Sequence, residues 1–389
     1  MKKQMRLVFR PNSKDENAAY SALLHRIGLW WDSFSKKSNE IKGLFKREAN
    51  FDLPQWMEDE LGAVADNLFW EYGPAVNSAG HRLVITPEAN HSLRPLVSLI
   101  IDEAPAIEDW EFYGYRLAEE PENAISFVEQ RTGIDISSWQ VQVGKGSGNQ
   151  ISLTYIGPSP DLEPAFITTE TLLGEKVLNE WIGSIDAQPL LTAEEECFIV
   201  PITELQGKVK ELINEIRQSV PKEPFVQRLS SLQWATFQCE PASLPDYVKQ
   251  RDLVIGISAD IDLYSACNGP MLFSSERFSQ SGELFTYLQV NDVTPIGEAK
   301  LDKKRKIEDK LGEALYESGM GCVIGSGTGI ENIYIDLALV NPQKAIPVIC
   351  KTLVELKAPI SSWLRFYDAS LGNEWVGMYD ETPHPIDSL

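Results

Sequence analysis

Residues 322–340 read CVIGSGTGIENIYIDLALV, and this stretch decides how the last third of the chain is expected to fold. In its second half, apolar residues at 333, 335, 337 and 339 alternate with other residues, which is the period of a half-buried strand. Its first half holds the glycine run 325–329, which reads GSGTG. A similar run, GKGSG at 144–148, is also followed by an alternating segment. The two runs therefore predict that one structural unit occurs twice.

The flanks of both glycine runs argue against a nucleotide-binding loop. A dinucleotide fingerprint needs a third glycine and a following helix, but Asn149 and Ile330 stand at that position and a strand follows each run. Neither run has the GxxxxGK[ST] pattern of a P-loop. We therefore expect two hairpin turns whose glycines supply positive φ. An anion- or ligand-binding loop is the alternative, and Lys145 makes the first run the stronger candidate for it.

The order of expected elements predicts an α+β fold of two domains, each containing a ferredoxin-like β-α-β-β-α-β unit, preceded by extra helices within 18–66. The first unit is expected to use strands at 110–116, 139–143 and 151–155 and helices at 121–132 and 170–185. The second is expected to use strands at 284–290, 322–324, 333–339 and 362–367 and helices at 302–318 and from 342. Prolines at 221 and 224 mark a boundary, which predicts domains 1–222 and 223–389.

The charge of the chain limits its partners. With 35 Lys and Arg against 57 Asp and Glu in 389 residues, the net charge is −22. Nucleic acid and anionic membranes need clustered basic residues, so neither is expected as a partner, whereas a basic protein is. A plainly acidic surface without a partner is the alternative.

The apolar and cysteine patterns predict a cytoplasmic protein. No apolar run reaches the length of a membrane span, and no signal-peptide core follows the N-terminus. Five cysteines, at 197, 239, 267, 322 and 350, are scattered without a CxxC pair, which is typical of thiols in a reducing compartment.

Few residues are candidates for chemistry. Asp260 and Asp262 alternate in a strand-like stretch, so their carboxylates would share a face and bind a cation or share a proton, unless that face is simply solvated. Cys267 lies in a turn-like context and would need a histidine base to act as a nucleophile; a buried inert thiol is the alternative. The charged runs Glu194–Glu196 and Lys303–Lys306 are expected to be solvated.

No catalytic constellation, cofactor fingerprint or metal-ligand spacing is present in the sequence. The four histidines, at 25, 81, 91 and 384, have none of the spacings of a zinc site. We therefore name no catalytic, cofactor-binding or metal residue, and keep Lys145, Asp260, Asp262 and Cys267 as the candidates if a site exists.

One block of the chain resembles a known pattern. Phe69–Pro74 reads FWEYGP, His81–Glu88 reads HRLVITPE, and Ala104-Pro105 precedes Trp110-Glu111-Phe112. This block resembles a family of uncharacterised bacterial proteins with a W-E-[FY]-G-P strand, and the resemblance implies a bacterial origin but no chemistry. Within it, Glu71 and Glu111 are expected to face away from their tryptophan neighbours.

Three functions follow as hypotheses. The first is a non-enzymatic interaction protein, of an accessory or immunity type, whose acidic surface meets a basic partner. The second is an enzyme of unrecognised type with a cleft between its domains, and the third is a small-ligand sensor. Dispersal of the candidate residues over the surface, in place of convergence in one deep pocket, would exclude the second hypothesis. Thermal-shift screening with metabolites would test the third.

Overall fold

The computed structural model describes residues 14–45, 47–48, 50–158, 160–189, 198–241 and 249–385. It is a mixed α+β structure, as expected, and divides after Leu117 into two compact units. The expected boundary at 222/223 stays a prediction; it falls inside the second unit, between helices α6 and α7. Cys197 and the run Glu194–Glu196 lie outside the described residues.

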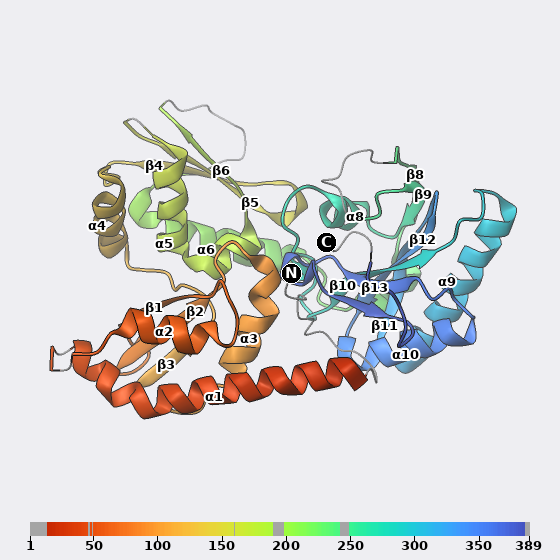
Figure 1. The fold of residues 1–389 in the computed structure, drawn as a ribbon. Helices are drawn as coiled ribbons and strands as arrows, with labels where there is room; N and C mark the ends of the chain where they lie inside the picture. Colours follow the sequence, from red (N-terminus) through yellow and green to blue (C-terminus); the bar gives the residue numbers. More distant parts are fainter. Residues whose placement is uncertain are drawn as a thin grey trace. The chain divides into compact units, whose positions relative to one another are not determined.

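The first unit packs helices on a three-stranded sheet (Figure 1). Its elements are α1 (Lys14–Phe45), α2 (Leu53–Gly62), β1 (Phe69–Pro74), β2 (His81–Thr86), α3 (Arg94–Asp102) and β3 (Trp110–Tyr113). β1 runs antiparallel and β3 parallel to β2. One face of α1 is buried, and its Trp31 donates a hydrogen bond from Nε1 to the carbonyl of Ile100, 2.8 Å away. Tryptophans of α1, α2 and β3 meet in this core, as their apolar spacing predicts.

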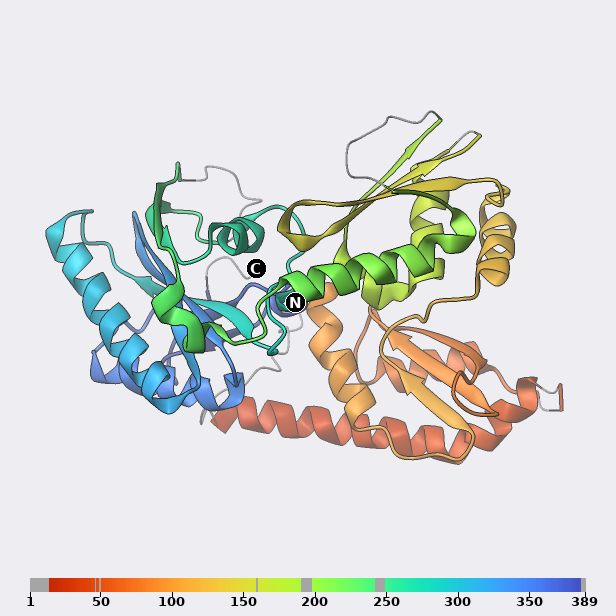
Figure 2. The ribbon, with the colours of Figure 1, turned by 180° about the vertical axis from the view of Figure 1, so that it is seen from behind.

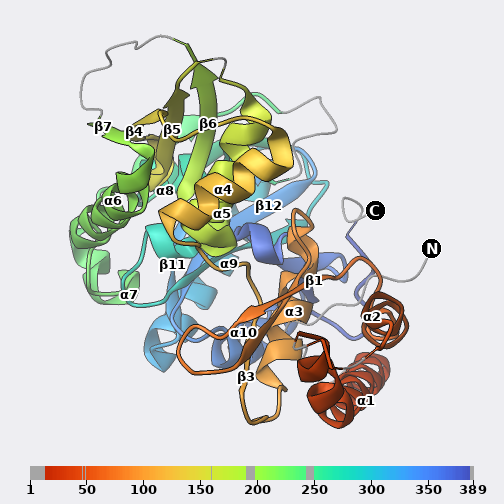
Figure 3. The same ribbon diagram turned by 90° about the vertical axis from the view of Figure 1, so that its left-hand side faces the viewer.

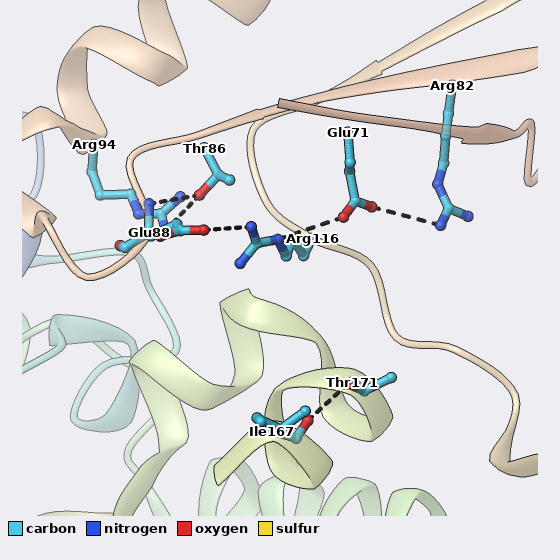
Figure 4. A network of polar contacts seen from close by, with 8 residues as sticks. All are labelled: Glu71, Arg82, Thr86, Glu88, Arg94, Arg116, Ile167 and Thr171. Atoms are coloured by element: carbon cyan, nitrogen blue, oxygen red, sulfur yellow. Dashed lines mark hydrogen bonds and ion pairs between the residues drawn. The ribbon is translucent and has the colours of Figure 1, made fainter. Parts of the chain in front are cut away.

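An ion-pair network ties the strands of the first unit together (Figure 4). Arg116 lies 2.5 Å from Glu88 and 3.5 Å from Glu71, and Glu71 also meets Arg82 at 3.7 Å. Glu71 and Glu111 do turn away from the aromatic core: the Glu111 carboxylate accepts hydrogen bonds from the 76–78 turn. These charges have structural partners, so the network explains the fold of this unit and offers no site.

The second unit begins with a four-stranded sheet whose helices cover one face. Its elements are α4 (Pro121–Thr132), β4 (Gln140–Lys145), β5 (Ile151–Ile156), α5 (Leu162–Trp181), β6 (Ile182–Gln188), β7 (Phe198–Pro201) and α6 (Leu205–Ser219). The strand order is β6-β5-β4-β7. Apolar side chains of α4, α5 and α6 share one core with β4 and β5. Figure 2 shows α6 running along the sheet, and Figure 3 shows α4 and α5 beside it.

The first expected repeat does not form one sheet. Its leading strand, β3, pairs with β2 in the first unit, because the helix before it returns the chain parallel to β2. Helix α5 also ends at Trp181 and continues directly into β6, which pairs parallel to β5. The expected helix at 170–185 is therefore wrong at its C-terminal end, because residues 182–185 already belong to β6. The sequence pattern did not predict this strand.

The rest of the second unit is a seven-stranded antiparallel sheet. Its elements are α7 (Phe225–Arg228), β8 (Ala235–Gln238), β9 (Leu253–Ser258), α8 (Ile261–Asn268), β10 (Leu284–Asn291), α9 (Glu298–Ser318), β11 (Gly321–Gly329), β12 (Asn332–Leu339), α10 (Pro342–Glu355), β13 (Ser362–Phe366) and β14 (Trp375–Gly377). The order is β14-β13-β10-β12-β11-β9-β8. Helices α9 and α10 cover one face, while α7, α8 and the 273–278 segment cover the other.

The second glycine run is a strand and not a hairpin turn. Gly325, Gly327 and Gly329 lie within β11, which pairs with β12 on one side and β9 on the other, and none of these glycines has positive φ. Added Cβ atoms would stand 2.6 Å from Asp336 Oδ2 at Gly325 and 2.2 Å from Leu253 Cδ1 at Gly327. Glycine is therefore favoured at these positions because neighbouring side chains occupy the space of a Cβ atom. The turn between β11 and β12 lies at residues 330–331.

None of the described helices combines the length and the apolar character that crossing a membrane would require.

Candidate functional site

A pocket of about 560 Å³ opens in the second unit beside the first glycine run. We call it the hairpin pocket. Its walls are the β4–β5 hairpin, the C-terminal end of α6, Arg228 at the end of α7, and the segment from Asp260 to Phe278. Three of the four candidate residues, Lys145, Asp260 and Asp262, line it, whereas Cys267 does not. The sequence candidates therefore largely converge.

The glycine run builds the hairpin wall of this pocket, as predicted. Gly144 and Lys145 end β4, a short 3-10 turn spans Ser147–Asn149, and Ile151 begins β5 opposite Lys145. Gly148 has φ of 63° and faces α8, where a Cβ at Gly148 would stand 3.1 Å from the Ala266 side chain. Glycine is favoured here because the turn needs a left-handed residue that also lies against a helix.

Two hydrogen bonds join the hairpin to the opposite wall, and a third lies within that wall. Asn149 donates from Nδ2 to the carbonyl of Arg277 over 2.9 Å, and Gln150 donates from Nε2 to the carbonyl of Leu272 over 3.0 Å. The Arg277 guanidinium donates to that same Leu272 carbonyl over 2.7 Å. Gln150 and Arg277 are only 5% and 1% exposed, so these bonds are shielded from water. Polar contacts that are largely buried therefore join the two walls of the pocket.

Asp260 and Asp262 reach the pocket by a different route from the one expected. They do not alternate in a strand, because Asp260 is the N-cap of α8 and Asp262 lies in the first turn. The Asp260 Oδ1 atom accepts a hydrogen bond from the Leu263 amide over 2.9 Å. Aspartate is favoured at a helix N-terminus. The cap bond therefore stabilises a helix here, in place of the strand that the alternation of Asp260 and Asp262 with apolar residues predicts.

Three of the charged side chains that line the pocket are in no ion pair. The side chains of Lys145, Arg228 and Asp262 make no hydrogen bond or ion pair within 4.0 Å with any described residue, although the charge of Arg228 acts to lower the pKa of the Glu283 carboxyl group, which burial raises. The Arg228 guanidinium instead lies over the Phe225 ring, 3.8 Å from its centre, with its buried Nε unbonded. No sequence motif points to Arg228 or Arg277, because each lies in a short helical turn that only the tertiary fold brings to the hairpin.

Other charged groups lie near Arg277. Arg277 also donates to the Glu180 carbonyl over 2.6 Å, and burial lowers the pKa of its guanidinium to about 10. Burial, together with the nearby Glu276 and Asp368 carboxylates, raises the pKa of Glu180 to about 7. Lys176 and Arg217 act in the opposite direction on that pKa. Glu180 therefore changes charge near neutral pH close to one wall of the pocket.

Cys267 lies on α8 and borders a buried polar cluster. Burial raises the pKa of its thiol well above the ordinary value, which is the environment of an inert cysteine. Its carbonyl accepts a hydrogen bond from Lys249, which also donates to the Tyr367 carbonyl. The Tyr367 hydroxyl and Gln250 both donate to Asp336 over 2.6 Å. Burial raises the pKa of Asp336 to about 6, although these two hydrogen bonds lower it.

A smaller pocket of about 280 Å³ lies beside this cluster and shares Ser265 and Gly269 with the hairpin pocket. Its Lys249 is already held by two carbonyl groups. In the part of the chain that the structure describes, no three His, Cys, Asp or Glu side chains gather as metal ligands. The hairpin pocket is thus the better candidate site.

No protein-family model matches the chain, and neither the curated proteins nor the solved structures contain a match to it.

Proposed function

We propose that this protein binds a small polar molecule in the hairpin pocket. The observation that carries the proposal is the convergence there of Lys145, Arg228 and Asp262, whose side chains form no ion pair with a described residue. Pockets of roughly 300–1,000 Å³ with a few placed polar groups are typical of small-molecule sites. The buried hydrogen bonds of Gln150 and Arg277 favour a pocket formed before the ligand arrives.

Binding is favoured over catalysis by the same residues. Asp260 is occupied by the α8 cap, and the Cys267 thiol is buried away from the pocket lining. A nucleophile with an adjacent base would need two side chains in hydrogen-bond contact, and the pocket's charged side chains are not in such contact.

A blocked pocket tests this proposal. Ser147 is exposed and lines the pocket, so Ser147→Trp should fill it; Ser138, an exposed residue of the same unit outside the lining, gives the control Ser138→Trp. In a thermal-shift screen of metabolites, a bound compound should raise the unfolding midpoint of the wild type and of Ser138→Trp but not of Ser147→Trp. A screen without any hit, or a shift that survives in Ser147→Trp, would refute the proposal.

A second candidate function is association with a basic protein, and the net charge of −22 favours it. Affinity capture at low and high salt tests it, because electrostatic retention must weaken as ions screen the attraction. Failure to retain a partner, or retention that ignores salt, counts against it.

We further propose a cytoplasmic location, a bacterial origin within the W-E-[FY]-G-P family, and no nucleic-acid partner, on the sequence grounds given above. We also propose that 284–366 is a ferredoxin-like unit. Its support is the connection β10-α9-β11-β12-α10-β13 with the spatial order β13-β10-β12-β11.

A further inference from the structure

The hairpin pocket holds charges of both signs that do not neutralise each other. Lys145 comes from the end of β4, Arg228 from α7, and Asp260 and Asp262 from the start of α8. No ion pair within 4.0 Å forms among these four described residues. Elsewhere in the second unit, charges of opposite sign do pair at short range, as Lys310 and Glu313 do at 2.6 Å.

Contacts within the fold position the groups that carry these charges. Lys145 ends a strand that pairs with β5 and β7, and its hairpin is fixed to the opposite wall through Asn149 and Gln150. Asp260 is fixed by its cap bond to Leu263. Arg228 is held by its stacking on Phe225. Separated charges in a concave site are available to a ligand, whereas an internal pair would have to be broken first.

The chemistry of the ligand follows from having both signs in one pocket. A simple anion would be attracted by Lys145 and Arg228 but repelled by Asp262. A simple cation would be attracted by Asp262 but repelled by Lys145 and Arg228. A molecule with one group of each sign pairs with both sets, which gives selectivity as well as attraction.

Resting on the proposed function, we propose that the ligand is a small zwitterion of the α-amino acid or short-peptide class. Its carboxylate lies by Lys145 and Arg228, and its ammonium group lies by Asp262 and the second carboxylate oxygen of Asp260. A volume of about 560 Å³ leaves room for a side chain besides the two charged groups.

The test uses the full chain and defined probes. The twenty free L-amino acids and a set of dipeptides are titrated by calorimetry, and each binder is compared with its N-acetyl form and its C-terminal amide. We expect at least one zwitterion to bind and to lose about tenfold or more in affinity when either end is blocked, because each block removes a charge-assisted contact.

Matched variants assign the contacts. Lys145→Met and Asp262→Asn should each weaken the zwitterion about tenfold or more, while Lys306→Met and Asp309→Asn, exposed positions of α9 outside the pocket lining, should leave affinity unchanged. Lys145→Met should not weaken binding of the amide any further, because the amide has no carboxylate for Lys145 to contact. Circular dichroism and the unfolding midpoint of each variant confirm that it is folded before binding is compared.

The possible outcomes distinguish failure of the zwitterion inference from failure of the proposed function. Equal binding of the N-acetyl form overturns the zwitterion inference and leaves an anion-binding protein. If the C-terminal amide binds as tightly as the zwitterion, the zwitterion inference is wrong and the protein binds a cation. If no zwitterion binds while a different metabolite raises the midpoint in a Ser147-dependent way, the ligand class is wrong and the proposed function stands. If no compound of either set binds, the proposed function fails as well.

Discussion

Glu180 shows how one residue gives the protein a pH dependence near neutrality. Its side chain is 20% exposed, and burial with the Glu276 and Asp368 charges raises its pKa from 4.5 to about 7. The folded state therefore holds this proton more tightly than the unfolded chain. The resulting stability is fully present below about pH 4.5 and is lost as the pH rises through about 7.

We expect Glu180→Gln to remove this dependence. The amide keeps the shape of the protonated carboxyl group but does not ionise, so the variant should gain stability over the wild type as pH rises from 5 to 8. The pKa shift of Glu180 corresponds to a gain of roughly 2 kcal/mol in the free energy of unfolding, after allowance for the partial exposure of the side chain. Urea unfolding of both proteins at pH 5, 6, 7 and 8 measures it. Glu317→Gln, an exposed position of α9, is the control. A difference between Glu180→Gln and wild type that stays constant over this range would contradict the assignment.

At the scale of elements, strand β11 depends on glycine for close packing. A Cβ at Gly325 would lie 2.6 Å from Asp336 Oδ2 and 3.0 Å from the Ile257 carbonyl, and Asp336 is held in place by Gln250 and Tyr367. Gly325→Ala should therefore destabilise the protein by about 1–3 kcal/mol, the usual cost of overpacking.

The matched control for this strand is Gly312→Ala, in the interior of α9. The nearest atom to an added Cβ there is 3.7 Å away, so alanine should be neutral or stabilise by up to about 1 kcal/mol through helix propensity. Denaturation midpoints of the two variants measure the contrast. If Gly325→Ala were as stable as Gly312→Ala, the proposed role of the Asp336 contact would be wrong.

The elements that the sequence predicts best are those with a strong period. The 18–48 helix, the 121–132 helix and the strands around both glycine runs follow from local patterns and match α1, α4, β4, β5 and β12. The errors have two physical causes. Asp260 and Asp262 alternate like strand residues, but the N-cap bond to Leu263 makes them the start of α8.

The second cause is tertiary pairing, which no local pattern encodes. β3 reads as the first strand of a repeat, yet it pairs with β2, and β11 reads as a hairpin, yet both of its edges are paired. The same limit applies to the site. Lys145, Asp260 and Asp262 could be singled out because their residue types suggest chemistry, while Arg228 and Arg277 enter the pocket only through packing.

At the scale of the whole molecule, the dominant property is a net charge of −22. Like charges repel over distances of about 10 Å at 0.1 M ionic strength, and this repulsion opposes the compact state more than the expanded one. The ion pairs of the described chain act in the opposite sense, but most, such as that of Lys351 with Glu355, are exposed and contribute little.

We therefore expect the thermal unfolding midpoint to rise as sodium chloride increases from 0.02 M to about 0.3 M at pH 7.5, because screening relieves repulsion more than it weakens exposed pairs. Differential scanning calorimetry measures the change. The same titration at pH 5, where protonation of carboxyl groups reduces the net charge, should give a smaller rise. Sucrose at matched osmolality separates screening from general exclusion of solute. A midpoint that falls with salt at pH 7.5 would mean that specific ion pairs, such as those of Arg116 with Glu71 and Glu88, outweigh the repulsion of the whole chain.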